Sequence, residues 1–465
     1  MVLISSAKMN ILGSPCKTLL ILVTIFYFAF IYLSNQFPNS PSTQKQKTRS
    51  GSDSDPTDLS HLVFGLVGSE NAWHHRKSYI ESWWRPNSTR GFLFLDKPPT
   101  GDLLPWSPSS PAYRVSDDLK TFLNKKDVTA QRIINGIMET YREDHENLRW
   151  LVMGDDDSIF FVDNIVRVLA GYDHTKYYYF GGHSEFVLSN YWYSFSQGFG
   201  GAGFILSLPL AKAMAREMES CLRRYRHLKA ADTTTMSCIA DIGVSLTPLP
   251  GIHQIDLRGD LSGFLSSHPK FPLMSLHHFD TVDPLFPTMN RSESTRHLMK
   301  AATVDHSRML QQTICYHRPT NWSFSISWGY SAHVYEKILP RSYLQYPIET
   351  FKTWLRSPRA PHYMFNTRLP SEDPCEAPHI FFYETIGKTT SEDEIVTAYS
   401  RAGPRGLPMC TFAGNHSADS ISRIHVHSPT TKRFQIDRSE CCEVQVDGNE
   451  ADVKFKECTK DEIIA

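Results

Sequence analysis

Three consecutive aspartates follow a short apolar run in the stretch "WLVMGDDDSIFFVDN", residues 150–164. They are Asp155, Asp156 and Asp157. Like charges this close together repel, and an unpaired buried carboxylate is costly. A hard divalent cation prefers oxygen ligands and would offset both costs. The run therefore predicts a D-x-D metal site, and the alternative is a helix N-terminus with surplus negative charge.

Two further stretches offer side chains that could act on a ligand. The stretch "SLHHFD" supplies His277 and His278 after a second apolar run, and one neutral imidazole could complete a metal shell. The stretch "AADTTTMSCIADIGV" supplies Asp232, which could act as a general base if it lies near a cleft. The alternatives are structural histidines, and an N-cap role for Asp232 with Thr235 three residues on.

The glycine-rich stretch "GFGGAGF", residues 198–204, includes Gly201 and Gly203. Glycines permit close backbone approach to a ligand, or a tight corner without any ligand. The stretch does not match G-x-G-x-x-G, and its order of loop, strand and helix is not that of a dinucleotide fingerprint. Both readings therefore stay open.

The elements that must position these residues alternate in type. Strands are predicted at "HLVFGLVGS", "TRGFLFLDK", "LRWLVMG", "KYYYFGG" and "GGAGFILS", and helices at "VTAQRIINGIMETYRE", "NIVRVLAGY" and "PLAKAMAREMESCLRR". Alternating strands and helices predict an α/β sheet. Ligands of open α/β sheets bind at the carboxyl ends of strands, where the three aspartates lie. After about residue 290 the alternation fades, and the aromatic, Pro-rich and Cys-rich remainder predicts a second, β-rich module.

The N-terminal region predicts membrane attachment. Residues 18–33, "TLLILVTIFYFAFIYL", are apolar and uncharged, which favours an uncleaved signal anchor over a cleaved signal or a buried core helix. The polar, low-complexity sequence that follows predicts a disordered stem. The predicted divisions are a cytosolic tail at 1–17, the anchor at 18–34, the stem at 35–58, a catalytic domain at 59–300 and an extension at 301–465.

Composition and cysteine placement narrow the function classes. The chain has 465 residues, 41% of them hydrophobic, and a formal net charge of −1, so it lacks the overall basicity of nucleic-acid-binding proteins. One cysteine, Cys16, precedes the anchor and eight follow it, an even number that predicts disulfides in an oxidising lumen. Four N-x-[ST] sequons, at Asn87, Asn290, Asn321 and Asn415, agree with this compartment.

Taken together, the ordered motifs resemble the Fringe-like, family-31 type of glycosyltransferases, and closely resemble the plant DUF604 proteins within that group. The motifs that carry the resemblance, spread over roughly residues 59–287, are "FGLVGSENAWHHRKSYIESWW", "WLVMGDDDSIFFVDN", "YYYFGGHSE", "GGAGFILS", "AADTTTMSCIADIGV" and "SLHHFD". The C-terminal part resembles the extension of the plant subgroup.

The resemblance implies a GT-A fold: an α/β nucleotide-binding sheet with helices on both faces. It implies a type II, single-pass Golgi membrane protein with a lumenal catalytic domain. The implied activity is inverting transfer from a UDP-sugar to a glycan or glycoprotein hydroxyl, forming a β-1,3 linkage, with Mn²⁺ or another divalent cation. The implied site residues are Asp155, Asp156, Asp157 and Arg76 toward nucleotide and metal, His277 rather than His278 as third metal ligand, Gly200 to Gly203 as the floor, and Asp232 as base.

The sequence departs from the family pattern at the base, because Ala230 and Ala231 stand where paired acids are usual. Asp241 is therefore the alternative base. This departure motivates a second hypothesis, a catalytically silent relative that binds sugar nucleotides or acts as a chaperone. A metal-dependent hydrolase would need a further ligand cluster that the sequence does not contain. The donor sugar and the acceptor cannot be read from the sequence.

Overall fold

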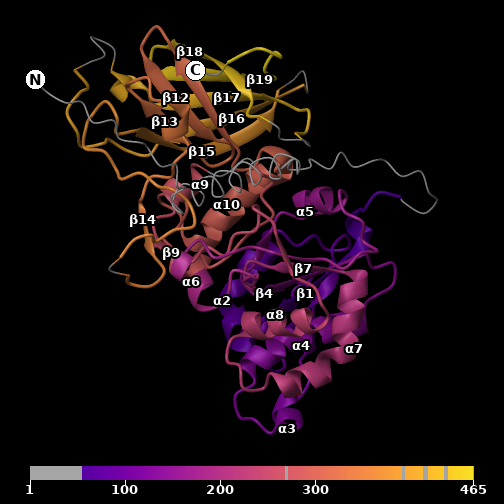
Figure 1. Ribbon diagram of the computed structural model, residues 1–465. Coiled ribbons are helices and arrows are strands. Elements are labelled where there is room, and N and C mark those ends of the chain that lie inside the picture. Colours follow the sequence, from indigo (N-terminus) through magenta and orange to yellow (C-terminus); the bar gives the residue numbers. More distant parts are fainter. Residues whose placement is uncertain are drawn as a thin grey trace, which may run out of the picture. The chain divides into compact units, whose positions relative to one another are not determined.

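A seven-stranded mixed sheet contains the strands predicted around the aspartates (Figure 1). Its strand order is β3-β2-β1-β4-β7-β6-β8, and β7 alone runs antiparallel to its neighbours. The strands are β1 (Leu62–Val67), β2 (Arg90–Leu95), β3 (Ala112–Val115), β4 (Trp150–Asp155), β6 (Tyr179–Gly181), β7 (Phe204–Ser207) and β8 (Leu246–Pro248). The predicted α/β sheet is confirmed.

The computed structural model describes residues 55–267, 271–357, 359–389, 393–411, 417–433 and 438–463. The chain divides into two units, Met1–Asp55 and Pro56–Ala465. The predicted tail and anchor, and the stem up to residue 54, lie outside the described residues. None of the helices within the described ranges is long and apolar enough to cross a membrane.

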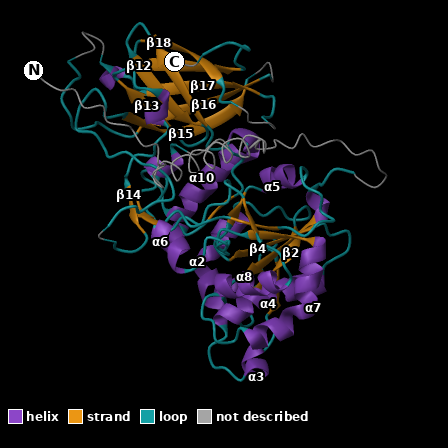
Figure 2. Ribbon diagram, in the orientation of Figure 1, coloured by secondary structure: helices purple, strands orange, loops and turns teal. Residues whose placement is uncertain are grey.

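Helices cover both faces of the seven-stranded sheet (Figure 2). The strand β1 is buried throughout, and its alternate side chains enter two separate apolar clusters. Leu62, Phe64 and Leu66 pack with side chains of α2 and α5, whereas Val63 and Val67 pack with α4, α7 and α8. The bounds of these helices are α2 (Glu70–Glu81), α4 (Thr129–Glu143), α5 (Val162–Leu169), α7 (Leu208–Arg224) and α8 (Ala231–Asp241). This two-sided burial explains why the strand reads as a continuous apolar run.

The remaining helices and 3-10 turns are short, apart from α10. They are η1 (Leu59–His61), η2 (Gly101–Leu103), α3 (Leu119–Leu123), α6 (Val187–Trp192), α9 (Ser262–Leu265), η3 (Phe279–Thr281), α10 (Arg291–Val304), η4 (His306–Arg308), α11 (Arg341–Leu344) and η5 (Ala418–Ser420). Asn290 caps α10 in a capping box with Glu293, so a helix begins where the regular alternation was expected to end.

The C-terminal part forms an eight-stranded sheet, as its alternating runs predicted. Its order is β11-β12-β13-β15-β16-β17-β19-β18, with β17 and β19 its parallel pair. The strands are β11 (Gln312–His317), β12 (Trp322–Ser327), β13 (Ser331–Tyr335), β15 (His379–Lys388), β16 (Glu394–Arg401), β17 (Arg423–Pro429), β18 (Cys441–Asp447) and β19 (Glu450–Lys456). The boundary at residue 300 remains a prediction.

All eight cysteines after residue 55 form disulfides, as their even number predicted. Cys221–Cys238 joins α7 to α8, and Cys315–Cys442 joins the edge strands β11 and β18. The other two bridges are Cys375–Cys410 and Cys441–Cys458. Three of the four sequon asparagines, Asn87, Asn290 and Asn321, are exposed, while Asn415 lies outside the described residues.

Candidate functional site

The strand β4 ends at Asp155, and the chain turns at once. The backbone N–H of Asp155 donates to Ser158 Oγ at 2.7 Å, and that hydroxyl donates to the Gly201 carbonyl oxygen at 2.6 Å. The turn is therefore tied to the glycine-rich loop that precedes β7. As a result, the three aspartates lie at the carboxyl end of a central strand, where the sequence pattern predicted them.

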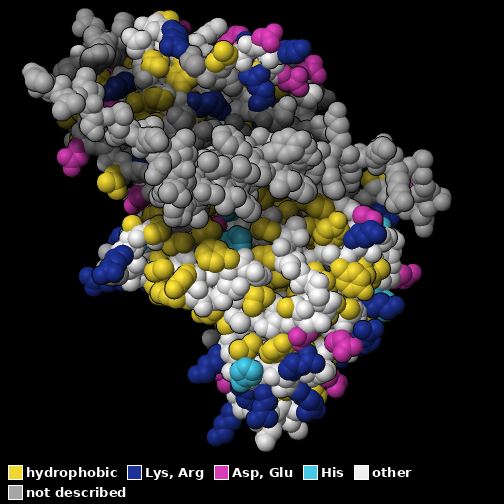
Figure 3. Space-filling model, in the orientation of Figure 1, with side chains coloured by type: hydrophobic (Ala, Val, Ile, Leu, Met, Phe, Trp, Pro, Cys, Tyr) yellow, Lys and Arg dark blue, Asp and Glu magenta, His cyan; other side chains and the backbone are white. Residues whose placement is uncertain are grey.

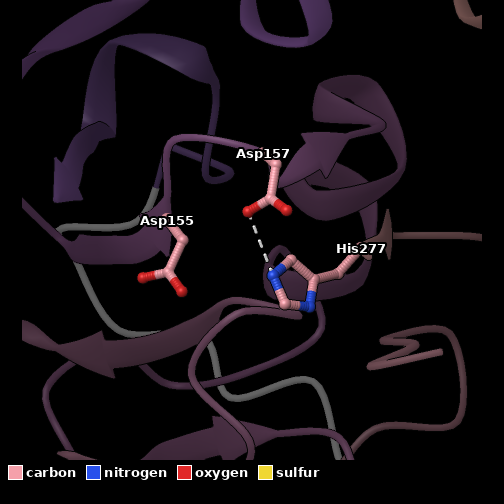
Figure 4. A group of neighbouring side chains, drawn as sticks. All are labelled: Asp155, Asp157 and His277. Carbon is pink, nitrogen blue, oxygen red and sulfur yellow. Dashed lines mark hydrogen bonds and ion pairs between the residues drawn. The ribbon is translucent and has the colours of Figure 1, made fainter. Parts of the chain in front are cut away.

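A two-stranded ladder brings the histidine stretch to this turn. Here β5 (Ile159–Phe160) pairs antiparallel with β10 (Ser275–Leu276), so His277 follows the ladder directly beside Asp157. The ligand atoms of Asp155, Asp157 and His277 all lie within 4.8 Å of one another. Figure 4 shows the two carboxylates and the imidazole pointing toward one another. This is the oxygen-and-nitrogen donor set that the sequence proposed for a divalent cation.

Two observations show that this group fits a cation. Asp157 is 1% exposed, and its Oδ2 accepts no hydrogen bond from any described residue, although the guanidinium of Arg76 lies 3.3 Å away. A Cβ on Gly201 would lie 2.1 Å from the ring of His277, so the loop leaves room for the imidazole only because residue 201 is glycine. Buried polar atoms without partners are rare, so this oxygen of Asp157 is available as a ligand of a cation.

The charges in this group are strongly coupled. Burial raises the pKa of Asp155 to about 7, against the opposing charge of His277. Burial opposes ionisation of Asp157 too, but His277 and Arg76 outweigh it and hold the pKa of Asp157 below its usual range. For His277, the adjacent Asp157 and Asp155 outweigh burial and raise its pKa to about 9. A cation bound here would therefore displace a proton from His277.

Arg76 binds the aspartates rather than pointing into open space. It lies on α2 and donates to Asp156 at 2.6 Å and to Asp280 at 2.8 Å. Burial opposes protonation, but the neighbouring carboxylates raise the pKa of Arg76 further. Asp156 is itself buried, and it also accepts from the N–H of Ser69 at 3.1 Å. Its two oxygens are thus both engaged by protein groups, and Asp156 holds Arg76 in place.

The two neighbouring histidines have different partners. His278 has a positive φ of 61°, and its Nδ1 lies 3.2 Å from Asp256 Oδ1. Its ring stacks on Trp354, with ring centroids 4.6 Å apart. The structure therefore brings His277, and not His278, into the group with the two aspartates, and His278 lies behind it.

Asp232 lies in the first turn of α8 and faces the glycine-rich loop. It accepts a hydrogen bond from the N–H of Gly200 at 2.9 Å, and a Cβ on Gly200 would lie 2.6 Å from its Oδ1. Burial raises the pKa of Asp232 to about 6, and the Gly200 N–H partly opposes this shift. The N-cap interpretation is wrong, because the N-cap of α8 is Ala230. A carboxylate with a pKa this close to neutral is suited to accept a proton.

Asp241 is the last residue of the same helix and does not join this group. It is exposed, forms an ion pair with Arg224, and accepts a hydrogen bond from Tyr225 Oη at 2.9 Å. Gly203, by contrast, lies at the site with a φ of +88°, and a Cβ there would meet the ring of Phe160 at 2.5 Å. The structure thus argues against Asp241 as the base and gives Gly203 a packing role.

Sequence reasoning missed three residues around the site. Asp256 contacts His278, Asp280 contacts Arg76, and Trp354 reaches His278 from the C-terminal part of the chain. Asp280 ends the "SLHHFD" stretch, so its position beside the histidines was a usable signal. Asp256 and Trp354 carry no such signal. Both contact His278, which is distant from them in sequence, and both contacts depend on the turn at His278.

The chain is similar to a curated glycosyltransferase over part of its length, and to a solved structure only weakly. A beta-1,3-glucosyltransferase of Mus musculus is 28% identical over 110 residues, which are 24% of this chain and 22% of that protein. The match therefore spans less than a quarter of that relative's length. The apo crystal structure of mouse xyloside xylosyltransferase 1 has a TM-score of 0.26 and 10% identity, and covers 41% of this chain and 84% of that one.

Two family descriptions match directly. Residues 113–261 match the family described as Fringe-like, and residues 189–442 match the family described as "Protein of unknown function, DUF604". Both matches confirm the resemblance that the sequence motifs indicated, whereas the plant subgroup remains a prediction. Because the second match extends over more than half of the 465 residues, the chain belongs to the DUF604 family.

Proposed function

We propose that this protein is a metal-dependent, inverting glycosyltransferase that moves a sugar from a UDP-sugar to a hydroxyl of a glycan or glycoprotein. The observation that carries the proposal is the group of Asp155, Asp157 and His277 beside Asp232, across the glycine-rich loop. The Fringe-like match over residues 113–261 supports the reaction class. The partial relative named beta-1,3-glucosyltransferase supports a β-1,3 linkage.

The residues divide the chemistry between them. Asp155, Asp157 and His277 would hold a divalent cation such as Mn²⁺, which when bound supplies Lewis-acid neutralisation of the leaving diphosphate. Asp232 takes the proton of the acceptor hydroxyl. The acceptor oxygen forms a bond to the anomeric carbon as the bond to the diphosphate breaks, so UDP leaves in one displacement and the configuration inverts. Arg76, fixed by Asp156 and Asp280, keeps positive charge next to this group.

We also propose that the protein acts in the Golgi lumen, held by an N-terminal type II anchor. Four disulfides fit an oxidising compartment. The exposed sequon asparagines fit the same compartment. The anchor itself is proposed from residues 18–34, which lie outside the described residues.

The full-length protein in detergent solution, incubated with a panel of UDP-sugars, tests the proposal. Free UDP is measured with Mn²⁺ and with EDTA. We expect release from one donor, abolished by EDTA and reduced roughly 10²- to 10⁴-fold in Asp157→Asn, because a metal ligand is lost. The matched control is Asp241→Asn, a carboxylate removed from the exposed end of α8, which keeps full release.

Two other outcomes contradict the proposal. Mn²⁺-dependent UDP binding without release from any donor, even with acceptor glycans present, would favour the silent sugar-nucleotide-binding relative. Release that is insensitive to EDTA and to Asp157→Asn would remove the metal from the mechanism.

A further inference from the structure

A cavity of about 740 Å³ lies between the α/β sheet and the C-terminal part of the chain. One wall follows β6 and includes His183, Ser184 and Glu185. The opposite wall includes Gln345, Tyr346, Met364, Phe365 and Asn366. Neither part of the chain encloses the cavity alone.

The two walls are joined by backbone hydrogen bonds. The N–H of Val187 donates to the His362 carbonyl oxygen at 3.0 Å, and the N–H of Met364 donates to the Glu185 carbonyl oxygen at 3.0 Å. Phe186 and Tyr363 form an antiparallel bridge between them. The extension thus forms a β-bridge with the segment after β6, and this bridge holds its residues at the cavity.

The lining of the cavity is mostly apolar, with a few polar side chains and little charge. No lysine or arginine is among the described residues that line it. The carboxylate of Glu185 is already occupied by the N–H of Ile255 and by His253 Nδ1. The side-chain amides of Gln345 and Asn366 make no hydrogen bond to another described residue. Aromatic faces with free amides, and no free charge, suit a neutral polyhydroxylated ligand rather than an anionic one.

An exposed aromatic run continues this surface. Tyr191, Trp192, Tyr193 and Phe195 are 73%, 54%, 53% and 52% exposed, and hydrophobic side chains gather over α6 in Figure 3. The Phe195 carbonyl oxygen lies 3.0 Å from His183 Nε2, on the cavity wall. Exposed aromatic side chains close together on a protein surface are typical of an interaction site.

Two connections link this surface to the candidate active site. The aromatic run leads directly into the loop whose Gly200 N–H binds Asp232. On the other side, Ser184 Oγ donates to Asp256 Oδ2, and Asp256 Oδ1 lies 3.2 Å from His278, next to His277. The cavity wall and the aromatic run are thus connected to the residues around Asp232 and His277 by short chain segments and hydrogen bonds.

We propose that the cavity and the aromatic run together bind a neutral glycan chain, the acceptor of the transfer, and that the C-terminal extension exists to complete this site. That the bound glycan is an acceptor rests on the proposed function. Sugar rings would stack on Trp192 and Tyr346, and Gln345 and Asn366 would bind their hydroxyl groups.

The test measures oligosaccharide binding by the full-length protein in detergent, separately from UDP release. The probes are neutral β-1,3-glucan, β-1,4-glucan and β-1,4-galactan oligosaccharides, with oligogalacturonate as the anionic counterpart. We expect at least one neutral probe to bind, and Trp192→Ala and Tyr346→Ala to weaken its Kd about tenfold each, because an aromatic stacking face is lost. The KM for acceptor rises in both variants.

Tyr177→Ala is the matched control, since Tyr177 is 51% exposed and lies before β6, at the strand end opposite the cavity. The inference is overturned if no neutral probe binds, if oligogalacturonate binds more tightly, or if both variants bind like wild type. A change in self-association in Trp192→Ala with unchanged oligosaccharide binding would assign the aromatic run to an interface between copies instead. If the wild-type protein binds an oligosaccharide but does not bind UDP, the proposed function is contradicted, while the assignment of a glycan site stands.

Discussion

Asp232 and Asp241 belong to one helix but lie in opposite environments. Asp232, in the first turn of α8, accepts the Gly200 N–H, and its burial raises its pKa to about 6. Asp241, at the last residue, is exposed and paired with Arg224. Spacing within the sequence offered both as bases, and only their surroundings separate them.

The pH dependence of transfer follows from Asp232. A base must be ionised, so we expect kcat/KM to fall about tenfold per pH unit below pH 6, because the pKa of Asp232 is raised to about 6. Asp232→Asn should lower the rate roughly 10²- to 10⁴-fold and remove this acid limb, while UDP affinity stays unchanged. A pH–rate profile of wild type, Asp232→Asn and Asp241→Asn decides the question. An acid limb that persists in Asp232→Asn, or disappears in Asp241→Asn, would assign the base elsewhere.

Gly201 sets the room for His277. In Gly201→Ala the new Cβ would lie 2.1 Å from the imidazole ring. We therefore expect the ring to shift and the affinity for Mn²⁺ to fall about 10- to 100-fold. Titration calorimetry or electron paramagnetic resonance measures that affinity. Gly387→Ala is the control, because nothing lies within 4 Å of its Cβ. Unchanged Mn²⁺ affinity in Gly201→Ala would show that His277 is not a ligand.

Short pairings between distant segments hold the site in place. The strand β9 (Leu257–Gly259), directly after Asp256, pairs with β14 (Phe351–Thr353) from the extension. Trp354 follows β14 and stacks on His278. The segment around β14, from the C-terminal part of the chain, therefore supports His278 and Asp256 and belongs to the framework of the site.

The disulfides act at the level of elements. Removing Cys221–Cys238 with a Cys221→Ser, Cys238→Ser double variant should lower the free energy of unfolding by about 3 kcal/mol, since the bridge closes a short loop. Removing Cys315–Cys442, which spans 127 residues, should cost about 5 kcal/mol on the same chain-entropy account. Urea unfolding of both double variants measures the difference. The opposite order of losses would show that native-state packing outweighs loop closure.

The regular elements could be predicted because their residues carry local patterns. The strand β4 is predicted by a continuous apolar run, and the helix α4 by apolar residues that repeat on one face. Ile134 and Ile137 on that face are fully buried, as expected. The aspartates follow because they adjoin β4. The elements β9 and β14 are only three residues long, and so short a strand has no readable alternation.

The choice of partners could not be predicted. Whether His277 or His278 joins the aspartates depends on a positive φ at His278 and on a ladder between segments more than 100 residues apart. That Asp156 holds Arg76 instead of a ligand depends on α2 packing across the end of β4. Such contacts are set by tertiary packing, for which a single sequence provides no periodic signal.

At the scale of the whole molecule, the proposed cation site would link folding and metal binding through His277. Its pKa is raised to about 9 in the metal-free protein. The protonated imidazole therefore stabilises the fold fully below its unfolded pKa of about 6.5, and this contribution is lost as the pH rises through about 9. A cation needs the neutral imidazole, so its stabilisation grows with pH over the same interval.

We therefore expect opposite slopes in two buffers. Relative to His277→Ala, the free energy of unfolding of the wild-type protein should fall by about 1.4 kcal/mol per pH unit between pH 6.5 and 9 in EDTA. Its increase on adding Mn²⁺ should grow by about the same amount per pH unit while Mn²⁺ exceeds its Kd. Differential scanning calorimetry across this range gives both slopes. Equal Mn²⁺ stabilisation of wild type and His277→Ala at every pH would contradict the assignment of the third ligand.

The joined edges of the eight-stranded sheet have a consequence for behaviour at high concentration. Exposed edge strands are templates on which other chains can add strands and aggregate. Here the two edges, β11 and β18, lie side by side and are fixed by Cys315–Cys442. Each edge strand thus lies against the other edge of the same sheet. Reduction of this single bond would open both edges at once, so a reducing environment would turn the extension from a stabilising module into a starting point for aggregation.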